Sequence, residues 1–183
     1  MNIHDTLYEE LHNDNLILSN GEFLPNIDEY FTIANKYPNL HLMLELKSDN
    51  NQEYEHRAIN ACVNKIQEYG MQNRITFISF SLSACIEFNR LYPSIDVFYL
   101  NGDKSSKELY ELGIDGMDYH YKYYYRHPEW IREAYQLGLK VAAWTVDDEN
   151  DMNILLSDGV EYLATNKPSV ALSVLENYRI IEF

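Results

Sequence analysis

The chain has 183 residues, of which 46% are hydrophobic and 14% aromatic, and its net charge is −15 at pH 7. This length and composition indicate one folded globular domain and count against disorder. The negative charge counts against broad binding to nucleic acid or to anionic lipid, but it allows a single phosphate ester held by a local cation. The first residues lack the basic and apolar regions of a secretion signal, and no later stretch is long and apolar enough to span a membrane. We therefore expect a cytoplasmic protein without a membrane span.

Apolar runs alternate with helix-like periodic segments along the chain. In chain order we expect a helix at 26–37, a strand at 40–47, a helix at 53–69, a strand at 75–80, a helix from about 84 to 91, a strand at 96–100, a helix at 104–112, a strand at 114–118, a helix at 128–137, a strand at 140–146, a helix ending at 157, a strand at 160–165 and a terminal helix from 168. This alternation predicts a parallel α/β sheet of the barrel or doubly wound kind. No glycine-rich phosphate loop follows any of these strands, which favours the barrel. Cys62 and Cys85 lie in apolar helix-like surroundings and are predicted to be buried free thiols rather than a disulfide.

The stretch 42–47, Leu-Met-Leu-Glu-Leu-Lys, is the most informative part of the sequence. Residues two apart on a strand point to the same face, so Glu45 and Lys47 are expected to project together. Catalytic groups of a parallel barrel lie where its strands end. A carboxylate that can hold a hard divalent cation, beside an ammonium that can hold an anion, suits a phosphate ester bound to a metal. The alternative is a structural ion pair at the end of a strand.

Several motifs, in order along the chain, resemble those of the glycerophosphodiester phosphodiesterase family. They are Leu-Pro-Asn-Ile-Asp-Glu-Tyr at 24–30, the E-x-K strand of Glu45 and Lys47, Ile-Ser-Phe-Ser at 78–81, His-Pro-Glu-Trp at 127–130, Ala-Ala-Trp-Thr-Val at 142–146, and the closing segment from Gly159 to Pro168. The resemblance runs from about residue 16 to residue 175. It implies a TIM barrel of the phosphatidylinositol-phosphodiesterase-like kind and hydrolysis of glycerophosphodiesters to an alcohol and glycerol 3-phosphate.

The sequence departs from the family at its front end. A TIM barrel has eight strands and typically about 250 residues, whereas six strands are predicted here. The "H-R-G", "E-x-D" and "H-D" motifs of the family supply two acid–base histidines and two of the three metal carboxylates, and no His-Arg-Gly is present. His4-Asp5 resembles "H-D", but its distance to Pro25 is too short for the loop that follows that motif, so we do not expect His4 to be catalytic. We expect an incomplete barrel, a single domain over residues 1–183 with an irregular segment at 1–25, which begins after the catalytic front end.

By resemblance, Glu45 ligates Mg²⁺ or Ca²⁺ and Lys47 contacts the phosphate. A single carboxylate is a weak site for such cations, because they take several oxygen ligands. His120, expected just past a strand, is a further candidate for acid–base chemistry at the barrel mouth. Trp144 is expected either to line the substrate pocket or to belong to the core. The tyrosines around His120 are expected to line a pocket or, as we favour, to pack on the barrel rim; they are Tyr119, Tyr121, Tyr123, Tyr124 and Tyr125.

An incomplete barrel has two open sheet edges, for which we expect either self-association or coverage by residues 15–24. Two functions follow from the same residues. The first is a metal-dependent phosphodiesterase acting on a small-molecule phosphodiester. The second is a non-catalytic remnant, or pseudoenzyme, that binds a phosphate ligand or a partner without turning it over.

Overall fold

A computed structural model describes residues 6–11, 17–47 and 51–181 of the chain. Its strands form one six-stranded parallel sheet in the order β1-β2-β3-β4-β5-β6, so each strand pairs with its neighbours in the sequence. The strands are β1 (Leu42–Leu46), β2 (Ile75–Ser79), β3 (Val97–Tyr99), β4 (Gly116–His120), β5 (Lys140–Trp144) and β6 (Tyr162–Leu163). The prediction of six parallel strands alternating with helices is confirmed.

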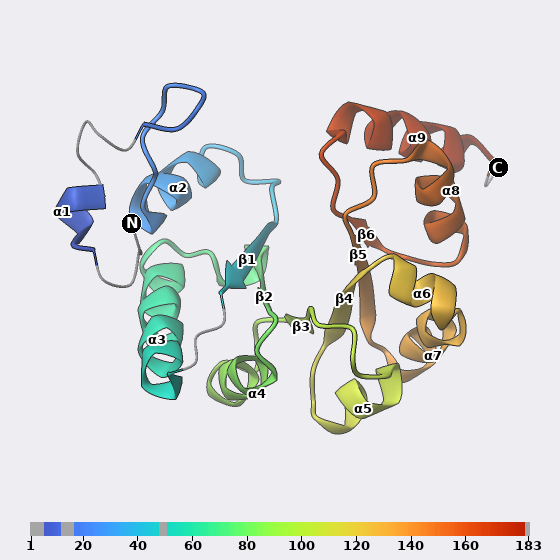
Figure 1. Ribbon diagram of the computed structural model, residues 1–183, viewed down its shortest axis with the longest axis horizontal. Coiled ribbons are helices and arrows are strands. Elements are labelled where there is room, and N and C mark those ends of the chain that lie inside the picture. The colour runs from blue at the N-terminus through green and yellow to red at the C-terminus, as the bar shows by residue number, and fades with distance from the viewer. Residues whose placement is uncertain (1–5, 12–16, 48–50, 182–183) are drawn as a thin grey trace.

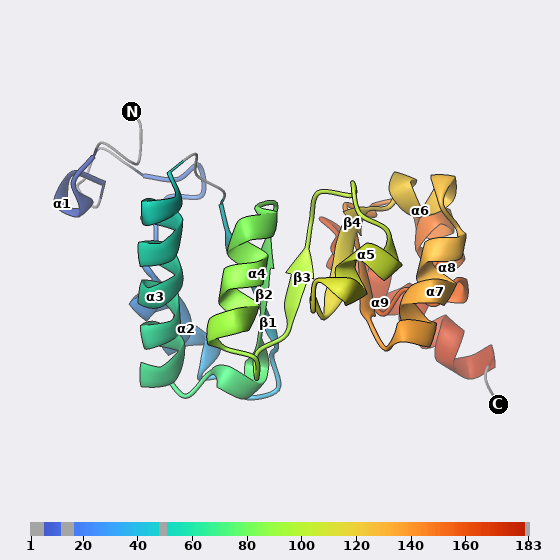
Figure 2. The same cartoon turned by 90° about the horizontal axis from the view of Figure 1, so that it is seen from below.

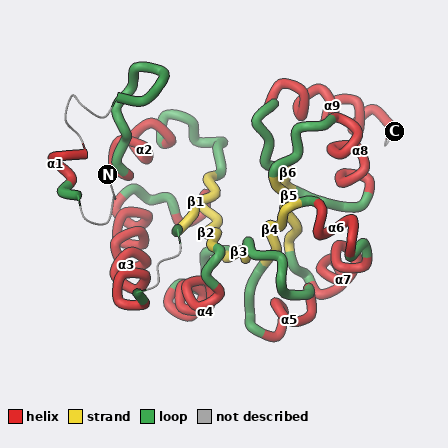
Figure 3. The backbone as a smooth tube through the Cα atoms, in the orientation of Figure 1, coloured by secondary structure: helices red, strands yellow, loops and turns green. Residues whose placement is uncertain are grey.

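The sheet curves into an arc, and the helices lie on its outer side (Figure 1). The backbone trace in Figure 3 follows the same succession of strand and helix. The helices are α1 (Tyr8–Leu11), α2 (Ile27–Ala34), α3 (Gln52–Glu68), the 3₁₀ turn η2 (Gln72–Arg74), α4 (Leu82–Leu91), α5 (Ser106–Glu111), α6 (Lys122–Arg126), α7 (Glu129–Leu137), α8 (Glu149–Ser157) and α9 (Pro168–Ile181). A curved parallel sheet with an outer layer of helices is part of a TIM barrel, so the predicted incomplete barrel is confirmed.

Local sequence signals explain where the helices begin and end. Asn26 and Ser105 cap α2 and α5, and in each case the carboxylate of the glutamate three residues later accepts a hydrogen bond from the backbone N–H of the cap residue. At the other end of α7, Gly138 adopts a left-handed conformation (φ +77°), which stops the helix at the predicted place. Helices α3 and α4 run side by side on the outer layer (Figures 1 and 2).

The main core lies between the sheet and the outer helices, and alternate residues of each strand enter it. On β4, Met117 and Tyr119 are fully buried in this core, so Asp118 and His120 lie on the inner, concave face. The bottom of the inner face is filled by Phe98, which is 1% exposed and packs against Tyr162 with ring centroids 6.1 Å apart. The sheet therefore separates a dry helix-covered layer from an inner face whose polar groups gather at one end.

Two expected boundaries differ from the observed ones. The strand expected at 114–118 runs instead from Gly116 to His120, because the Asp115 carboxylate accepts a hydrogen bond from the backbone of Val97 and holds the preceding turn. The residues after Asp118 are aromatic, so the sequence gives no clear signal of where this strand ends. The last strand is reduced to Tyr162–Leu163, shorter than the predicted 160–165.

The described part of the N-terminal segment contains α1 and a small antiparallel hairpin in which Ile17 faces Phe23. Phe23 and Ile33 of α2 line the same shallow hollow, so the hairpin lies against the outer helical layer. Within the described residues, β1 pairs only with β2 and β6 only with β5. No helix in the described ranges has the length and apolarity needed to cross a membrane.

Candidate functional site

The predicted pair Glu45 and Lys47 lies at the carboxyl end of β1. Leu44 and Leu46 pack against the core, so Glu45 between them faces the inner side, and Lys47 follows directly after the last residue of the strand. The Lys47 ammonium contacts Oε1 of Glu45 at 2.6 Å, and the side chain of Lys47 is 80% exposed. The structure thus brings together the two groups that the sequence singled out, at the end of the sheet where barrel sites lie.

Ser79 fixes the backbone beneath this pair. Its hydroxyl is fully buried, donates a 2.8 Å hydrogen bond to the carbonyl of Leu46 and accepts one from the backbone of Ser81. Leu46 stands between Glu45 and Lys47, so the end of β2 holds the end of β1 in place. The Ser-Phe motif in the sequence therefore has a structural role next to the candidate site.

Asp118 is the residue that sequence reasoning missed. It lies on the inner face of β4, is 3% exposed, and its Oδ1 atom has no hydrogen-bond partner among the described residues. Burial, and to a smaller extent the negative charge of Glu45, raise the pKa of Asp118 to about 7. The influence of Glu45 places the two carboxylates in the same electrostatic environment, although they come from strands that are not neighbours. The signal in the sequence was the period-two alternation of Gly116, Asp118 and His120 with apolar residues.

Trp144 and His120 complete the rim of the inner face. The Trp144 indole donates a 2.8 Å hydrogen bond to the carbonyl of Asp118. Its ring meets those of Phe80 and His120 edge-on, with centroids 5.7 and 5.2 Å apart. Because Phe80 follows β2 and Trp144 ends β5, their contact spans the inner side of the arc. Trp144 is half-buried, so it is both packed and accessible at the mouth.

His120 is the last residue of β4, rather than a residue beyond the strand. Its Nδ1 lies 3.3 Å from the backbone nitrogen of Lys122 and accepts that hydrogen bond. Burial, with the positive charges of Lys122 and Arg126, lowers the pKa of His120 below its usual value. A neutral ring that accepts at Nδ1 carries its hydrogen on Nε2, so His120 can donate a hydrogen bond from Nε2. The other histidine candidate, His4, lies outside the described residues.

The tyrosines around His120 were expected on the barrel rim, but Tyr119 and Tyr124 belong to the core. Tyr119 is fully buried and donates to the carbonyl of Lys104, and Tyr124 is 1% exposed and donates to the carbonyl of Ala142. Tyr125 donates to Asp151 of α8 at 2.7 Å. The hydroxyls of these three tyrosines form hydrogen bonds within the protein, and residues 122–126 form α6 instead of a loop.

The closing motif of the sequence also has a structural role. The Asp147 carboxylate, just after β5, accepts hydrogen bonds from the Thr165 hydroxyl at 2.9 Å and from the backbone and side chain of Asn166 at 2.7 and 2.9 Å. These bonds tie the segment after β5 to the segment after β6. They therefore hold the carboxyl ends of the last two strands together.

The oxygen groups at the mouth fit a hard divalent cation in part. Glu45 and Asp118 provide two carboxylates, one of them with an unpartnered buried oxygen. Mg²⁺ is commonly held by one or two carboxylates and completed by water and substrate phosphate oxygens. In the described residues, no cluster of three or more histidine, cysteine, aspartate or glutamate side chains has the arrangement of a metal site.

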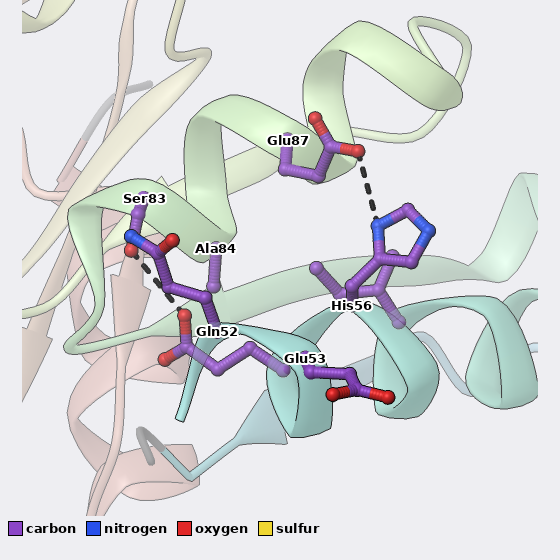
Figure 4. Close-up of a pocket in the computed structure, with 8 residues that line it drawn as sticks. Gln52, Glu53, His56, Ser83, Ala84 and Glu87 are labelled. Carbon is purple, nitrogen blue, oxygen red and sulfur yellow. Dashed lines mark hydrogen bonds and ion pairs between the residues drawn. The ribbon is translucent and has the colours of Figure 1, made fainter. Parts of the chain in front are cut away.

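A separate hollow of about 450 Å³ lies between α3 and α4 on the outer layer (Figure 4). His56 faces Glu87 across it at 3.3 Å, and Ser83 donates to Glu55 at 3.3 Å. Three glutamates line this hollow, so it repels an anionic phosphate ester. The hollow lies between helices and not at the ends of the strands. The inner mouth is therefore the better candidate site for a phosphate ester.

The fold and the mouth together define a class: a (β/α)-barrel protein with acidic, basic and aromatic groups at the carboxyl ends of its strands. The model of the glycerophosphoryl diester phosphodiesterase family matches residues 3–170. The chain therefore belongs to this family, as the sequence motifs indicated.

Individual relatives agree with the family assignment. A glycerophosphodiester phosphodiesterase of Parabacteroides distasonis has a crystal structure with 38% identity to this chain and a TM-score of 0.93, over 97% of this chain and 74% of that one. A phosphodiesterase of Oleispira antarctica, solved in complex with the product sn-glycerol-3-phosphate, is 21% identical with a TM-score of 0.70, over 85% of this chain and 63% of that one, and shares the fold.

A curated glycerophosphodiester phosphodiesterase of Caldanaerobacter subterraneus subsp. tengcongensis is 24% identical over 159 residues, which are 85% of this chain. The chain spans 63% of the length of that relative.

Proposed function

We propose that the chain binds a glycerophosphodiester at the inner mouth of the half-barrel and hydrolyses it to an alcohol and glycerol 3-phosphate. The observation that carries this proposal is the Glu45–Lys47 pair at the carboxyl end of β1. Family membership and the product named for the Oleispira relative support the substrate class.

Each residue at the mouth has a role that follows from its chemistry. Lys47, whose side chain is 80% exposed, would bind a phosphate oxygen through a charge-assisted hydrogen bond. Glu45 would hold Mg²⁺ or Ca²⁺, and such an ion supplies Lewis-acid polarisation of the phosphoryl group. Trp144 would pack against the glycerol part of the ligand, since its ring borders the mouth beside Asp118.

In the reaction, water attacks phosphorus and the bond to the head-group oxygen breaks, so that oxygen must gain a proton as it leaves. The attacking water releases a proton to solvent and the leaving oxygen takes one from solvent, while His120, whose neutral ring carries its hydrogen on Nε2, would donate a hydrogen bond to that oxygen. Among the described residues at the carboxyl ends of the strands, it is the histidine with access to the inner face.

The second candidate function is binding of the same phosphate ligand without turnover. Two observations favour it. The Nδ1 atom of His120 already accepts a hydrogen bond from the backbone N–H of Lys122. In the described part of the mouth, no second histidine lies opposite His120. Acid–base hydrolysis needs both a proton acceptor and a proton donor. A pseudoenzyme would keep Lys47 and Glu45 for binding alone.

The deciding experiment is release of glycerol 3-phosphate from glycerophosphocholine in the presence of Mg²⁺ or Ca²⁺, with Glu45→Ala as the matched variant. Turnover that disappears in the variant supports the phosphodiesterase. Binding of glycerol 3-phosphate by calorimetry, without turnover above the variant, supports the pseudoenzyme. If the wild type showed no turnover and no binding, both candidate functions would be overturned.

A further inference from the structure

The Asp118 carboxylate is buried without a compensating group of its own. It is 3% exposed, and its Oδ1 atom finds no donor among the described residues. A buried anion that lacks hydrogen bonds and a counterion is costly, because the interior does not replace the water it has lost. The cost calls for a compensating group that approaches from the inner face.

The neighbours of Asp118 cannot provide that compensation. The Tyr124 hydroxyl, on the core side of β4, donates to the carbonyl of Ala142 at 2.7 Å. The Trp144 indole donates to the backbone carbonyl of Asp118, not to its carboxylate. The Lys47 ammonium is paired with Glu45 at 2.6 Å. Glu45 itself adds a second negative charge to the surroundings of Asp118.

Two carboxylates that face one inner space, with one oxygen unpartnered, form an arrangement that a cation stabilises. We propose, on the basis of the proposed function, that Asp118 is a second carboxylate ligand of the divalent cation held by Glu45. The class of ligand is a hard cation, Mg²⁺ or Ca²⁺, because both donors are carboxylate oxygens.

With Asp118 as a ligand, the site has two carboxylates, whereas the sequence alone identified one. One carboxylate makes a weak site, because Mg²⁺ and Ca²⁺ take several oxygen ligands, whereas two carboxylates with water and a substrate phosphate supply more of them. The hydrogen bond from Trp144 to the carbonyl of Asp118 fixes the backbone of the proposed metal-ligating residue. Hydrogen bonds of this kind orient the residues that bind a metal. The same hydrogen bond also places an indole beside the proposed ion.

The experiment uses that indole. Tb³⁺ substitutes for Ca²⁺ and emits when a nearby tryptophan is excited, so sensitised emission of the full chain reports ion binding without any turnover. The variants are Asp118→Asn and Glu45→Gln, which remove charge and keep shape. The control is Asp115→Asn, which removes a half-buried carboxylate at the opposite end of the same strand.

We expect the Kd for Tb³⁺ to rise by roughly tenfold or more in Asp118→Asn and in Glu45→Gln, and to stay within about twofold in Asp115→Asn. Calcium should raise the melting temperature of the wild type and not that of Asp118→Asn. Wild-type affinity in Asp118→Asn, together with loss in Glu45→Gln, would overturn the proposal, as would the absence of Tb³⁺ binding by the wild type.

Failure of this inference and failure of the proposed function can be distinguished. Ion binding that depends on Asp118 without release of glycerol 3-phosphate refutes the phosphodiesterase alone. Turnover of glycerophosphocholine combined with unchanged ion affinity in Asp118→Asn refutes the role of Asp118 alone.

Discussion

The ammonium of Lys47 lies 2.6 Å from a carboxylate oxygen of Glu45, two residues earlier on the same strand. The Lys47 side chain is 80% exposed and that of Glu45 is 29% exposed. Exposed ion pairs of this kind contribute at most about 1 kcal/mol to stability. Stability alone therefore gives little reason for this pair, and the proposed role of Lys47 in ligand binding can be tested separately from folding.

Substitution of Lys47 tests that explanation directly. Lys47→Met should weaken binding of glycerol 3-phosphate by roughly ten- to a hundredfold, because a charge-assisted hydrogen bond contributes about 1.5–3 kcal/mol. The free energy of unfolding should change by less than about 0.5 kcal/mol. Calorimetric titration and urea unfolding measure the two quantities. Lys107→Met, which removes an exposed lysine on α5, is the control; an equal loss of affinity in both variants would refute a specific role for Lys47.

The buried carboxylate of Asp118 predicts a pH dependence of stability in the metal-free protein. Its pKa is raised from 3.8 to about 7 in the folded chain, so between these values the folded state binds more protons than the unfolded state. The contribution of Asp118 to stability is therefore full below about pH 4 and is lost as the pH rises to about 7. At 1.36 kcal/mol per pH unit, the loss amounts to about 4 kcal/mol at most.

Asp118→Asn should remove this slope. Urea unfolding in EDTA at pH 5 and pH 8 should show a larger decrease in the wild type than in the variant, and the variant should be the more stable of the two at pH 8. Glu111→Gln, which removes an exposed carboxylate of α5, is the control. Parallel pH profiles for the wild type and Asp118→Asn would show that Asp118 does not titrate in this range.

The two cysteines are free, as predicted from their surroundings, and their burial makes a further expectation possible. Cys85 is fully buried in α4, and burial raises its pKa to about 12. Burial also raises the pKa of Cys62, which is only half-buried. Thiolates are the reactive species, so Cys85 should resist a thiol reagent until the protein unfolds. Mass spectrometry after native alkylation should find label on Cys62 first; label on Cys85 at an equal rate would contradict the buried position.

Much of the fold was predictable because the strands are short apolar runs separated by amphipathic helices. The run at 42–47 and the helix stop at Gly138 are local signals, and both lie where they were expected. The end of β4 was not predictable in the same way, because Tyr119 and His120 continue the strand with polar and aromatic residues. Their place depends on pairing with Ala143 and Trp144 of β5, which local sequence does not reveal.

The candidate site was predictable only where its residues share a strand. Glu45 and Lys47 are two residues apart, so strand geometry alone brings them together. Asp118 reaches the same inner face through the curvature of a sheet whose intervening strands are β2 and β3. That relationship depends on tertiary structure, and neither the spacing nor the composition of the sequence contains it.

The inner face also constrains a glycine. Gly116 lies opposite Phe98 in the register of β3 and β4, and a Cβ atom at this position would lie 2.5 Å from the Phe98 ring and 2.8 Å from the carbonyl oxygen of Lys140. Both distances are below van der Waals contact. The ring of Phe98 therefore fills the bottom of the inner face because residue 116 has no side chain.

Gly116→Ala should consequently destabilise the protein by about 1–3 kcal/mol, the usual cost of overpacking. Phe98→Leu in the same chain should recover part of this loss, since a smaller side chain relieves the first clash while the Lys140 carbonyl stays in place. A double-mutant cycle measured by urea unfolding separates the two effects. Additive losses from Gly116→Ala and Phe98→Leu would mean that the two residues do not compete for space, and that the bottom of the half-barrel is less tightly packed than their contact implies.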